Sequence, residues 1–233
     1  MARIIAGSVG GRTIAVPPRG TRPTTDRVRE ALFTALDHDG LLDGARVLDL
    51  YAGSGALGLE AASRGAAHVD LVEADRRAAD VCRANARSLG LTGLVRTHQA
   101  KVETFLAGGT GATAGATGAH AGATGGASRA VGAVPDGGWT LAFLDPPYDV
   151  DSSRVATVLA ALVPHLAADA VVVLERSVRS EPVALPEGLE AWRDRRYGET
   201  VLHLLDHVAP GGTAGPDGDP ADGSADDARE VLP

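Results

Sequence analysis

The sequence predicts an α/β fold in which a mostly parallel β-sheet carries helices on both faces. Three observations predict it. Short apolar runs alternate with amphipathic segments from residue 46 onwards, the first apolar run ends in a glycine-rich loop, and 44% of the 233 residues are hydrophobic. A chain of this length and composition can bury the core of one such domain.

The expected strands of the parallel sheet are apolar runs, at 46–51, 68–73, 94–99, 139–145 and 170–175. The helices between them are expected at 55–64, 76–89, 102–106 and 153–166. Glycine follows two of these helices, as it commonly does at helix ends. Because strands that alternate with helices form parallel units, these elements form one sheet. Residues 190–196 and 200–205 flank Tyr197-Gly198 and predict an antiparallel hairpin at its C-terminal edge.

A small basic unit is expected ahead of this sheet. Residues 3–6 and 12–16 flank Gly10-Gly11, which predicts a β-hairpin. A helix follows Pro23, with Thr24 or Thr25 as its N-cap. Its apolar residues have the spacing of one helix face, at positions 28, 31, 32, 35 and 36. We therefore expect residues 1–40 to form a basic hairpin and helix packed on a core domain of residues 41–208.

Charge is unevenly distributed along the chain. The net charge is −8, but residues 209–233 alone carry −5, and residues 1–30 hold six arginines and carry +4. A basic end on a nearly neutral body can bind phosphate. A solvated arginine-rich surface explains the same charge equally well.

Two segments are expected to lie outside the packed core. Residues 107–138 are almost wholly Ala, Gly and Thr, which predicts a flexible insert within the domain, because such a segment buries too little apolar surface to offset its ordering entropy. Residues 209–233 are rich in Pro, Gly and Asp and predict a disordered acidic tail.

Several classes of protein are excluded by composition. No apolar run approaches the roughly 18 residues of a membrane span, and the first residues lack the apolar stretch of a signal peptide. We expect a cytoplasmic protein with no membrane contact. Cys82 is the only cysteine, so no intrachain disulfide or cysteine-based zinc site can form. The seven histidines show no metal-ligand spacing, so no metal is expected.

The loop of residues 49–58 has the composition of a cofactor-binding turn. Gly53 and Gly55 allow a tight turn and close approach to a ligand, and Gly58 lets the helix pack closely on the strand. Residues 53–58 fit G-x-G-x-x-G, and Glu73 follows 20 residues after Gly53. The Glu73 carboxylate can accept hydrogen bonds from ribose hydroxyls. These features permit either S-adenosylmethionine or a nicotinamide cofactor.

Asp49 favours S-adenosylmethionine. It lies in the first strand just ahead of the glycines, where a carboxylate would repel a pyrophosphate. The same carboxylate can hold, directly or through water, the ammonium of the methionine moiety. An oxidoreductase also has no need of the motif that ends the fourth strand.

That motif is Asp145-Pro146-Pro147-Tyr148. The two prolines stop the strand and make the turn rigid, and the end of this strand faces the crevice where ligands bind. An aromatic exocyclic amine is a poor nucleophile because its lone pair is delocalised. The Asp145 side chain and the Pro146 carbonyl can accept its two N–H hydrogens, and Tyr148 can stack on the base. We expect in-line methyl transfer to an extruded or unpaired base.

Together these motifs resemble the RsmD-type methyltransferases, which modify guanine N2 in small-subunit (16S) ribosomal RNA. The resemblance covers residues 3–206 apart from the insert, and it is carried by Arg3-Ile4-Ile5-Ala6-Gly7, Arg22-Pro23-Thr24-Thr25-Asp26-Arg27-Val28-Arg29-Glu30 and the two motifs above. The Asp-Pro-Pro-Tyr motif is shared with DNA adenine and protein glutamine methyltransferases, so it specifies amine chemistry. The assignment of ribosomal RNA as the substrate depends on the more specific Arg-Pro-Thr-Thr-Asp-Arg block. The resemblance implies the class I S-adenosylmethionine-dependent methyltransferase (Rossmann-like) fold.

The resemblance also implies a set of site residues. The cofactor would be bound by Asp49, Ala52, Gly53, Gly55 and Glu73, with Thr25 and Arg27 near its methionine end and Gln99 and Ala100 beside its adenine. RNA binding is expected at Arg3, Arg12, Arg22 and Arg29. Lys101 either approaches the cofactor or lies on the surface.

The partner implied is ribosomal RNA, naked or within a partly assembled small subunit, bound by a monomer. Two alternatives stay open: a DNA adenine-N6 methyltransferase and a nicotinamide-dependent oxidoreductase. A DNA enzyme usually needs an added target-recognition region, whereas this sequence offers only a small N-terminal hairpin.

Overall fold

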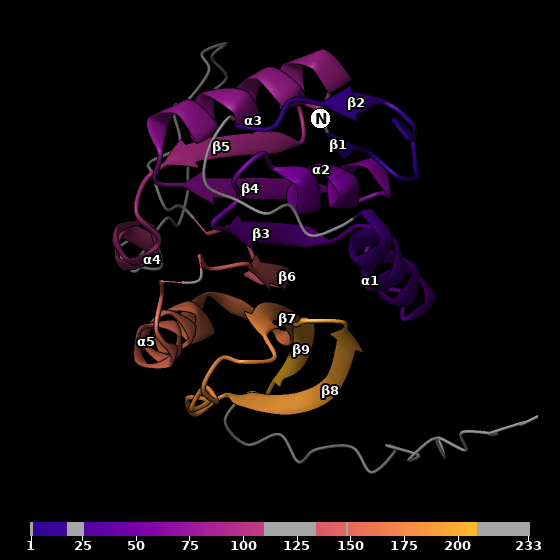
Figure 1. The fold of residues 1–233 in the computed structure, drawn as a ribbon. Helices are drawn as coiled ribbons and strands as arrows, with labels where there is room; N and C mark the ends of the chain where they lie inside the picture. The colour runs from indigo at the N-terminus through magenta and orange to yellow at the C-terminus, as the bar shows by residue number, and fades with distance from the viewer. Residues whose placement is uncertain (1, 18–25, 110–133, 148, 209–233) are drawn as a thin grey trace, which may run out of the picture.

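The computed structural model describes residues 2–17, 26–109, 134–147 and 149–208. Its main sheet has seven strands in the order β5-β4-β3-β6-β7-β9-β8 (Figure 1). The parallel strands are β3 (Arg46–Leu50), β4 (His68–Glu73), β5 (Val95–Gln99), β6 (Trp139–Leu144) and β7 (Leu166–Ser177). The antiparallel pair β8 (Leu189–Tyr197) and β9 (Thr200–His207) continues the sheet beyond β7. The predicted parallel sheet with an antiparallel edge hairpin is confirmed.

The helices cover both faces of the sheet, and each face has its own apolar core (Figure 1). One face carries α1 (Asp26–His38), α2 (Ala56–Ser63) and α3 (Arg76–Leu89). The other carries α4 (Val102–Gly109), α5 (Ser152–Leu162) and a short 3-10 helix, Val163–His165. Strands buried on both faces need near-continuous apolar sequence, which is why most residues of β3, β6 and the middle of β7 are apolar.

Local signals set several helix boundaries. α3 has the predicted bounds because the Asp75 carboxylate accepts the Ala78 N–H at 2.9 Å, and Gly90 ends the helix at a φ of 77°. α5 stops at Leu162 rather than at residue 166, because Pro164 lacks an N–H and cannot continue an α-helix. β7 then starts at Leu166, which pairs with Trp139, rather than at residue 170.

The N-terminal hairpin packs on α2. Its strands are β1 (Ala2–Arg3) and β2 (Thr13–Ile14), shorter than predicted. The buried Glu60 carboxylate accepts the N–H groups of Ile5 and Ala6 at 2.6 and 3.1 Å. These bonds replace the strand pairing that a longer hairpin would supply.

Some predictions fall outside the described residues. The predicted N-cap threonines, the centre of the insert (110–133) and the acidic tail lie there, so the proposed domain limits stay predictions. α4 runs to Gly109, so the first residues assigned to the insert are helical. Every helix in the described part of the chain is too short or too polar to span a bilayer.

Candidate active site

A cavity of about 350 Å³ opens at the carboxyl ends of β3, β4 and β6. Four predicted site residues line it: Gly53, Glu73, Asp145 and Pro147. The parallel strands bring them together because the carboxyl ends of such strands share one edge of the sheet. One cavity therefore joins the glycine loop to the Asp-Pro-Pro turn.

The glycine loop turns sharply from β3 into α2. Gly53 and Gly55 have φ of 58° and 78°, a region that glycine enters without strain. At Gly58 a Cβ would lie 2.4 Å from Leu71 and 2.9 Å from Val69, so the predicted close packing of α2 on β4 is confirmed. The loop geometry therefore requires glycine at these positions.

Hydrogen bonds to the Glu73 side chain stabilise this loop. One oxygen of its carboxylate accepts the Gly53 N–H at 2.8 Å, and the other accepts the Asp75 N–H at 2.8 Å. The side chain is half-buried and lines the cavity. Its position at the end of β4 fits the predicted ribose contact, which stays a prediction.

Asp49 is buried behind the loop. Its Oδ2 accepts the Gly58 N–H at 2.9 Å near the start of α2, and its side chain is not among those lining the cavity. Burial raises its pKa to about 7, an effect that the Gly58 hydrogen bond opposes and Glu73 reinforces. A nearby cation would stabilise the charged form of this carboxylate and lower its pKa.

Asp145 follows β6 directly and is half-buried at the cavity wall. Burial raises its pKa well above the usual range, and the carboxylates of Glu175 and Asp49 raise it further. The Pro147 carbonyl accepts the Val150 N–H at 3.0 Å, which closes the turn.

Several cavity residues were not predicted as site residues. Tyr51 lines the cavity at a φ of 63°, which is uncommon for a residue other than glycine, and its buried hydroxyl has no hydrogen-bond partner among the described residues. Arg154 of α5 binds Glu103 of α4 at 2.7 Å across the cavity wall. Lys101 is exposed and also lines the cavity, so its position is compatible with both roles left open by the sequence. Tyr51 lies within the 49–58 loop, whereas no motif marked Arg154 and Glu103, because these two residues meet only through folding.

The remaining predicted cofactor residues in the described part of the chain do not line the cavity. Ala52 and Gly55 are buried in the loop. Gln99 ends β5 opposite Glu73, and the Glu73 carbonyl accepts the N–H of the next residue, Ala100, at 3.1 Å. Arg27 is exposed in the first turn of α1. Two further predicted residues, Thr25 and Tyr148, fall outside the described residues.

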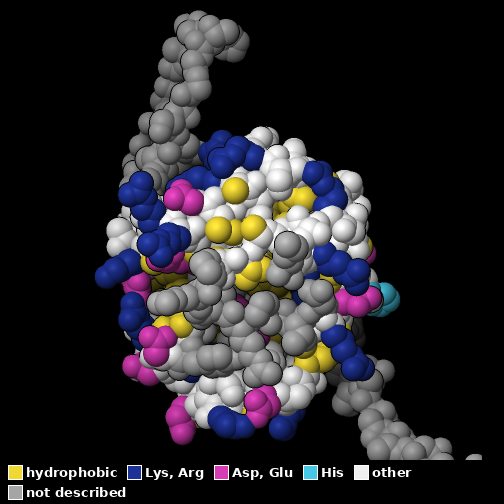
Figure 2. Space-filling model, turned by 45° about the horizontal axis from the view of Figure 1, so that its top comes forward, with side chains coloured by type: hydrophobic (Ala, Val, Ile, Leu, Met, Phe, Trp, Pro, Cys, Tyr) yellow, Lys and Arg dark blue, Asp and Glu magenta, His cyan; other side chains and the backbone are white. Residues whose placement is uncertain are grey.

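The predicted RNA-binding arginines differ in exposure. Arg3 is exposed; Arg12 is exposed too, although its guanidinium donates to the carbonyls of Ser88 and Leu89 at the end of α3. Arg29 is only 1% exposed and donates to the Arg3 carbonyl. The prediction for Arg29 is therefore corrected, because a guanidinium enclosed in the core cannot meet a phosphate. Arg22 lies outside the described residues. Figure 2 shows other Lys and Arg side chains around the margin of one face.

In the described part of the chain, no group of three or more His, Cys, Asp or Glu side chains is placed to hold a metal ion. Cys82 is fully buried and donates to the Gly53 carbonyl at 3.3 Å. Burial raises the pKa of its thiol, so it packs under the loop instead of acting as a nucleophile.

This sheet order, with a glycine loop after β3 and an Asp-Pro-Pro turn after β6, defines a class I methyltransferase. A profile of the family described as "Conserved hypothetical protein 95" matches residues 2–115 and 122–206. The chain belongs to this family, and the resemblance to the RsmD-type methyltransferases is confirmed.

Individual relatives agree with this assignment. A Bacillus subtilis protein named "Putative rRNA methyltransferase YlbH" is 34% identical over 206 residues, covering 87% of this chain and 97% of its own. The Escherichia coli K12 "Ribosomal RNA small subunit methyltransferase D" is 46% identical over 106 residues, 45% of this chain and 52% of its own. A solved structure titled "Putative methyltransferase yhhF from Escherichia coli" superposes with a TM-score of 0.70 at 30% identity, covering 89% of this chain and 98% of that one.

The predicted cofactor, S-adenosyl-L-methionine, is the methyl donor of this class of enzyme. Two neighbours that share the fold alone, at 13% and 16% identity, have titles that name bound SAM and S-adenosyl-L-homocysteine.

Proposed function

We propose that this chain transfers a methyl group from S-adenosylmethionine to the N2 amine of a guanine in 16S ribosomal RNA. The observation that carries the chemistry is the single cavity lined by Gly53 and Glu73 at one side and by Asp145 and Pro147 at the other. The names of the two bacterial relatives support ribosomal RNA as the substrate. The Arg-Pro-Thr-Thr-Asp-Arg block at residues 22–27 supports guanine N2.

The residues present fit the cofactor. A cavity of about 350 Å³ lies within the range of roughly 300–1,000 Å³ for small-ligand sites. Glu73 offers acceptors for ribose hydroxyls, and Tyr51 offers a buried hydroxyl without a partner. The carboxyl groups of Asp49 and Asp145 have raised pKa values, and a bound cation would lower them by stabilising the charged forms. When bound, the cofactor supplies a methyl group on a positively charged sulfur.

In this proposal Asp145 and Pro146 prepare the nucleophile. The Asp145 carboxylate accepts one N–H of the target amine and the Pro146 carbonyl accepts the other. The amine then becomes pyramidal, with its lone pair directed at the methyl group. Pro147 keeps the turn rigid through its bond to Val150, so the two acceptors stay in place. The predicted stacking partner for the base is Tyr148.

The positive N-terminal unit would contact the RNA backbone. Arg3 and Arg12 are exposed, and Arg22 stays in the predicted set. Contacts of this kind weaken steeply with salt, because binding releases counterions. We expect the enzyme to act as a cytoplasmic monomer on naked 16S RNA or on a partly assembled small subunit.

The first test is substitution of Asp145. Asp145→Ala removes one acceptor and should lower kcat by about 100-fold or more, while S-adenosylhomocysteine affinity changes little. Asp145→Asn keeps an acceptor oxygen and should retain more activity than the alanine variant. Methyl transfer from labelled cofactor to 16S RNA measures both variants. Near-normal turnover in Asp145→Ala would contradict the mechanism.

The second test separates the substrates and cofactors. Calorimetry should show binding of S-adenosylhomocysteine and none of NAD; binding of NAD alone would favour the oxidoreductase. Mass spectrometry of ribosomal RNA from a gene-deletion strain should show the loss of one N2-methylguanine. Transfer to adenine in DNA, with intact ribosomal RNA methylation in the deletion strain, would favour the DNA enzyme.

A further inference from the structure

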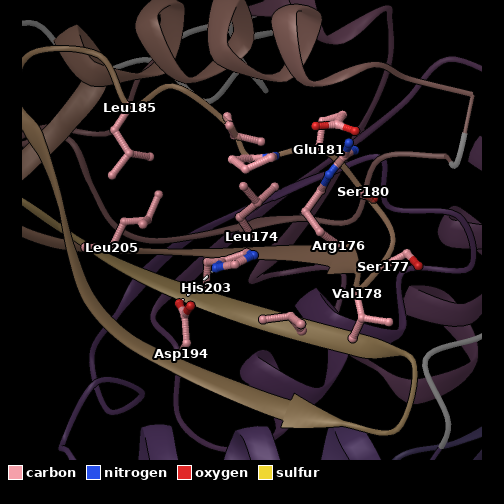
Figure 3. A pocket seen from close by; sticks show the side chains of 14 residues that line it. Leu174, Arg176, Ser177, Val178, Ser180, Glu181, Leu185, Asp194, His203 and Leu205 are labelled. Atoms are coloured by element: carbon pink, nitrogen blue, oxygen red, sulfur yellow. Dashed lines mark hydrogen bonds and ion pairs between the residues drawn. The ribbon is translucent and has the colours of Figure 1, made fainter.

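A second cavity, of about 310 Å³, lies on the face of the sheet that carries α4 and α5. It is enclosed by β7, β9, β8 and the segment 178–185 (Figure 3). Figure 3 shows Leu185 and Leu205 at one end and Arg176 and Glu181 at the other, with His203 between them. None of these residues belongs to the cavity that holds the Asp-Pro-Pro turn.

Hydrogen bonds connect the wall of this second cavity to the candidate catalytic turn. The Arg176 guanidinium donates to the Val150 carbonyl at 3.1 Å and to Ser152 Oγ at 3.2 Å. Ser152 Oγ in turn donates to the Glu181 carbonyl at 2.6 Å. The side chain of Val150 lines the first cavity. Arg176, which lines the second cavity, is therefore hydrogen-bonded to Val150, which lines the first.

The lining of the second cavity suits a nucleobase and not a phosphate. Leu174, Val201 and Leu205 offer apolar contact to the flat face of a base. Asp194 accepts from His203 Nδ1 at 2.8 Å, which leaves the other ring nitrogen and the carboxylates to meet base edges. The only arginine in the lining is Arg176. Its two terminal nitrogens are engaged by Val150 and Ser152, while its buried Nε has no partner among the described residues. Two carboxylates beside one engaged cation would repel a phosphate.

We propose that this cavity receives the base of an RNA nucleotide that neighbours the methylated one. The inference rests on the proposed function, because it requires an RNA substrate. A base that is methylated must leave its stack, and proteins that read unstacked RNA commonly hold neighbouring bases in pockets of their own. A base held beside Arg176, which is hydrogen-bonded to Val150 of the first cavity, would fix the position of its neighbour at Asp145. This cavity is thus a specificity-determining site for the methylation reaction.

The cavity can be filled from two sides without touching the catalytic turn. Ala191 lies on the exposed edge strand β8, and Leu185 lies on the opposite wall. Ala191→Phe and Leu185→Trp should each raise the KM for RNA about tenfold or more, the loss expected when one stacked base is displaced. S-adenosylhomocysteine affinity should stay unchanged. Ala160→Phe, on the exposed side of α5, is the matched control and should behave as the wild type.

The occupant is identified with modified RNA. Once the methylated nucleotide is mapped, short RNAs are made with an abasic site at each flanking position. One abasic position should weaken binding to the wild type but not to Ala191→Phe, because the cavity is already filled. Equal sensitivity of both proteins at every position would overturn the proposal.

The remaining outcomes are also decisive. An unchanged KM in both filled variants, with normal methylation by the wild type, overturns the second cavity alone. A loss of S-adenosylhomocysteine affinity in both filled variants assigns the cavity to the cofactor site and overturns it as well. A wild type that methylates no ribosomal RNA overturns the proposed function itself.

Discussion

At the scale of single residues, the site is defined by carboxylates held away from water. Asp49 is 1% exposed, and Asp145 lies half-buried near Glu175 and Asp49. Burial disfavours the charged form of a carboxylate, so each pKa is raised. A positively charged ligand reverses this effect. The electrostatics of the site therefore favour a cation such as a sulfonium or an ammonium.

Cofactor affinity should depend on pH through Asp49. Its pKa of about 7 lies above the value of roughly 3.9 for an unfolded aspartate. For the protein alone, the contribution of this group to stability falls as the pH rises from about 4 to about 7. The ammonium of the cofactor favours the carboxylate, so affinity for S-adenosylhomocysteine should rise about tenfold between pH 6 and 8. Calorimetric titration with S-adenosylhomocysteine at several pH values in this range measures the affinity. Asp49→Asn should lose the dependence, and an unchanged profile in that variant would refute the assignment.

Tyr51 should contribute one hydrogen bond to a ligand. Its hydroxyl is buried at the cavity without a partner, an arrangement that is costly unless a ligand supplies one. Tyr51→Phe should weaken cofactor binding by about 0.5–1.5 kcal/mol and leave the melting temperature of the protein alone unchanged or higher. Equal affinities of the wild type and Tyr51→Phe would show that the hydroxyl has no ligand contact.

At the scale of elements, side chains of α2 and α3 hold the N-terminal hairpin against the glycine loop. Glu60 and Ser63 of α2 bind backbone groups of residues 5–9. Asn85 of α3 donates to the carbonyls of Ala15 and Ser54, each at 2.9 Å. The hairpin and the loop are therefore one unit, so damage to the hairpin should also reach the cofactor site.

Two glycines of the hairpin test this connection. Gly7 and Gly11 have nearly the same φ, 83° and 80°, but a Cβ on Gly7 would lie 2.0 Å from the Ser63 carbonyl oxygen, whereas one on Gly11 meets nothing within 4 Å. Gly11→Ala should cost about 1–2 kcal/mol, and Gly7→Ala about 1–3 kcal/mol more. At about 2–4 °C per kcal/mol, thermal unfolding will separate the two variants. Equal losses would show that the Ser63 contact does not matter.

At the scale of the whole molecule, a buried polar network ties three strands of the sheet together. The Asp70 carboxylate in β4 binds His68 at 2.9 Å, His98 of β5 at 2.7 Å and the indole N–H of Trp139 in β6 at 3.1 Å. Burial opposes ionisation of Asp70, but the two histidines outweigh it and hold its pKa well below the usual range. The network lies beneath α4, whose Phe105 ring contacts the rings of His98 and Trp139.

Removal of this carboxylate should destabilise the fold. Asp70→Asn should cost about 3–5 kcal/mol near neutral pH, because it breaks a buried ionic network. Asp194→Asn breaks an exposed histidine pair of similar length, 2.8 Å, and should cost less than about 1 kcal/mol. Urea unfolding of the wild type and of both variants measures the two losses in the free energy of unfolding.

Acid should reduce this difference. The folded pKa of Asp70 is depressed, so its contribution is present above the unfolded value of about 4 and is lost as the pH falls below it. A cost for Asp70→Asn no larger than that for Asp194→Asn at neutral pH would show that the network is not structural.

The sequence by itself determined the parallel sheet, the glycine loop and the place of Asp145. These features follow from short-range patterns: apolar runs that end at glycine or proline, in an order that puts all their carboxyl ends at one edge. Glu73 and Asp145 were predictable site residues for this reason, because a strand end is a position that chain order alone defines.

Only the tertiary structure decided the partners of the remaining side chains. Arg29 is an ordinary helix arginine in the sequence, yet it binds the Arg3 carbonyl inside the core. Tyr51 and Arg154 come from segments about a hundred residues apart and line one cavity, and Arg176 joins a second cavity to the turn that follows Asp145. No local pattern encodes such contacts, because burial and hydrogen bonding between distant segments depend on how the helices and strands pack, and that packing is set by the whole core at once.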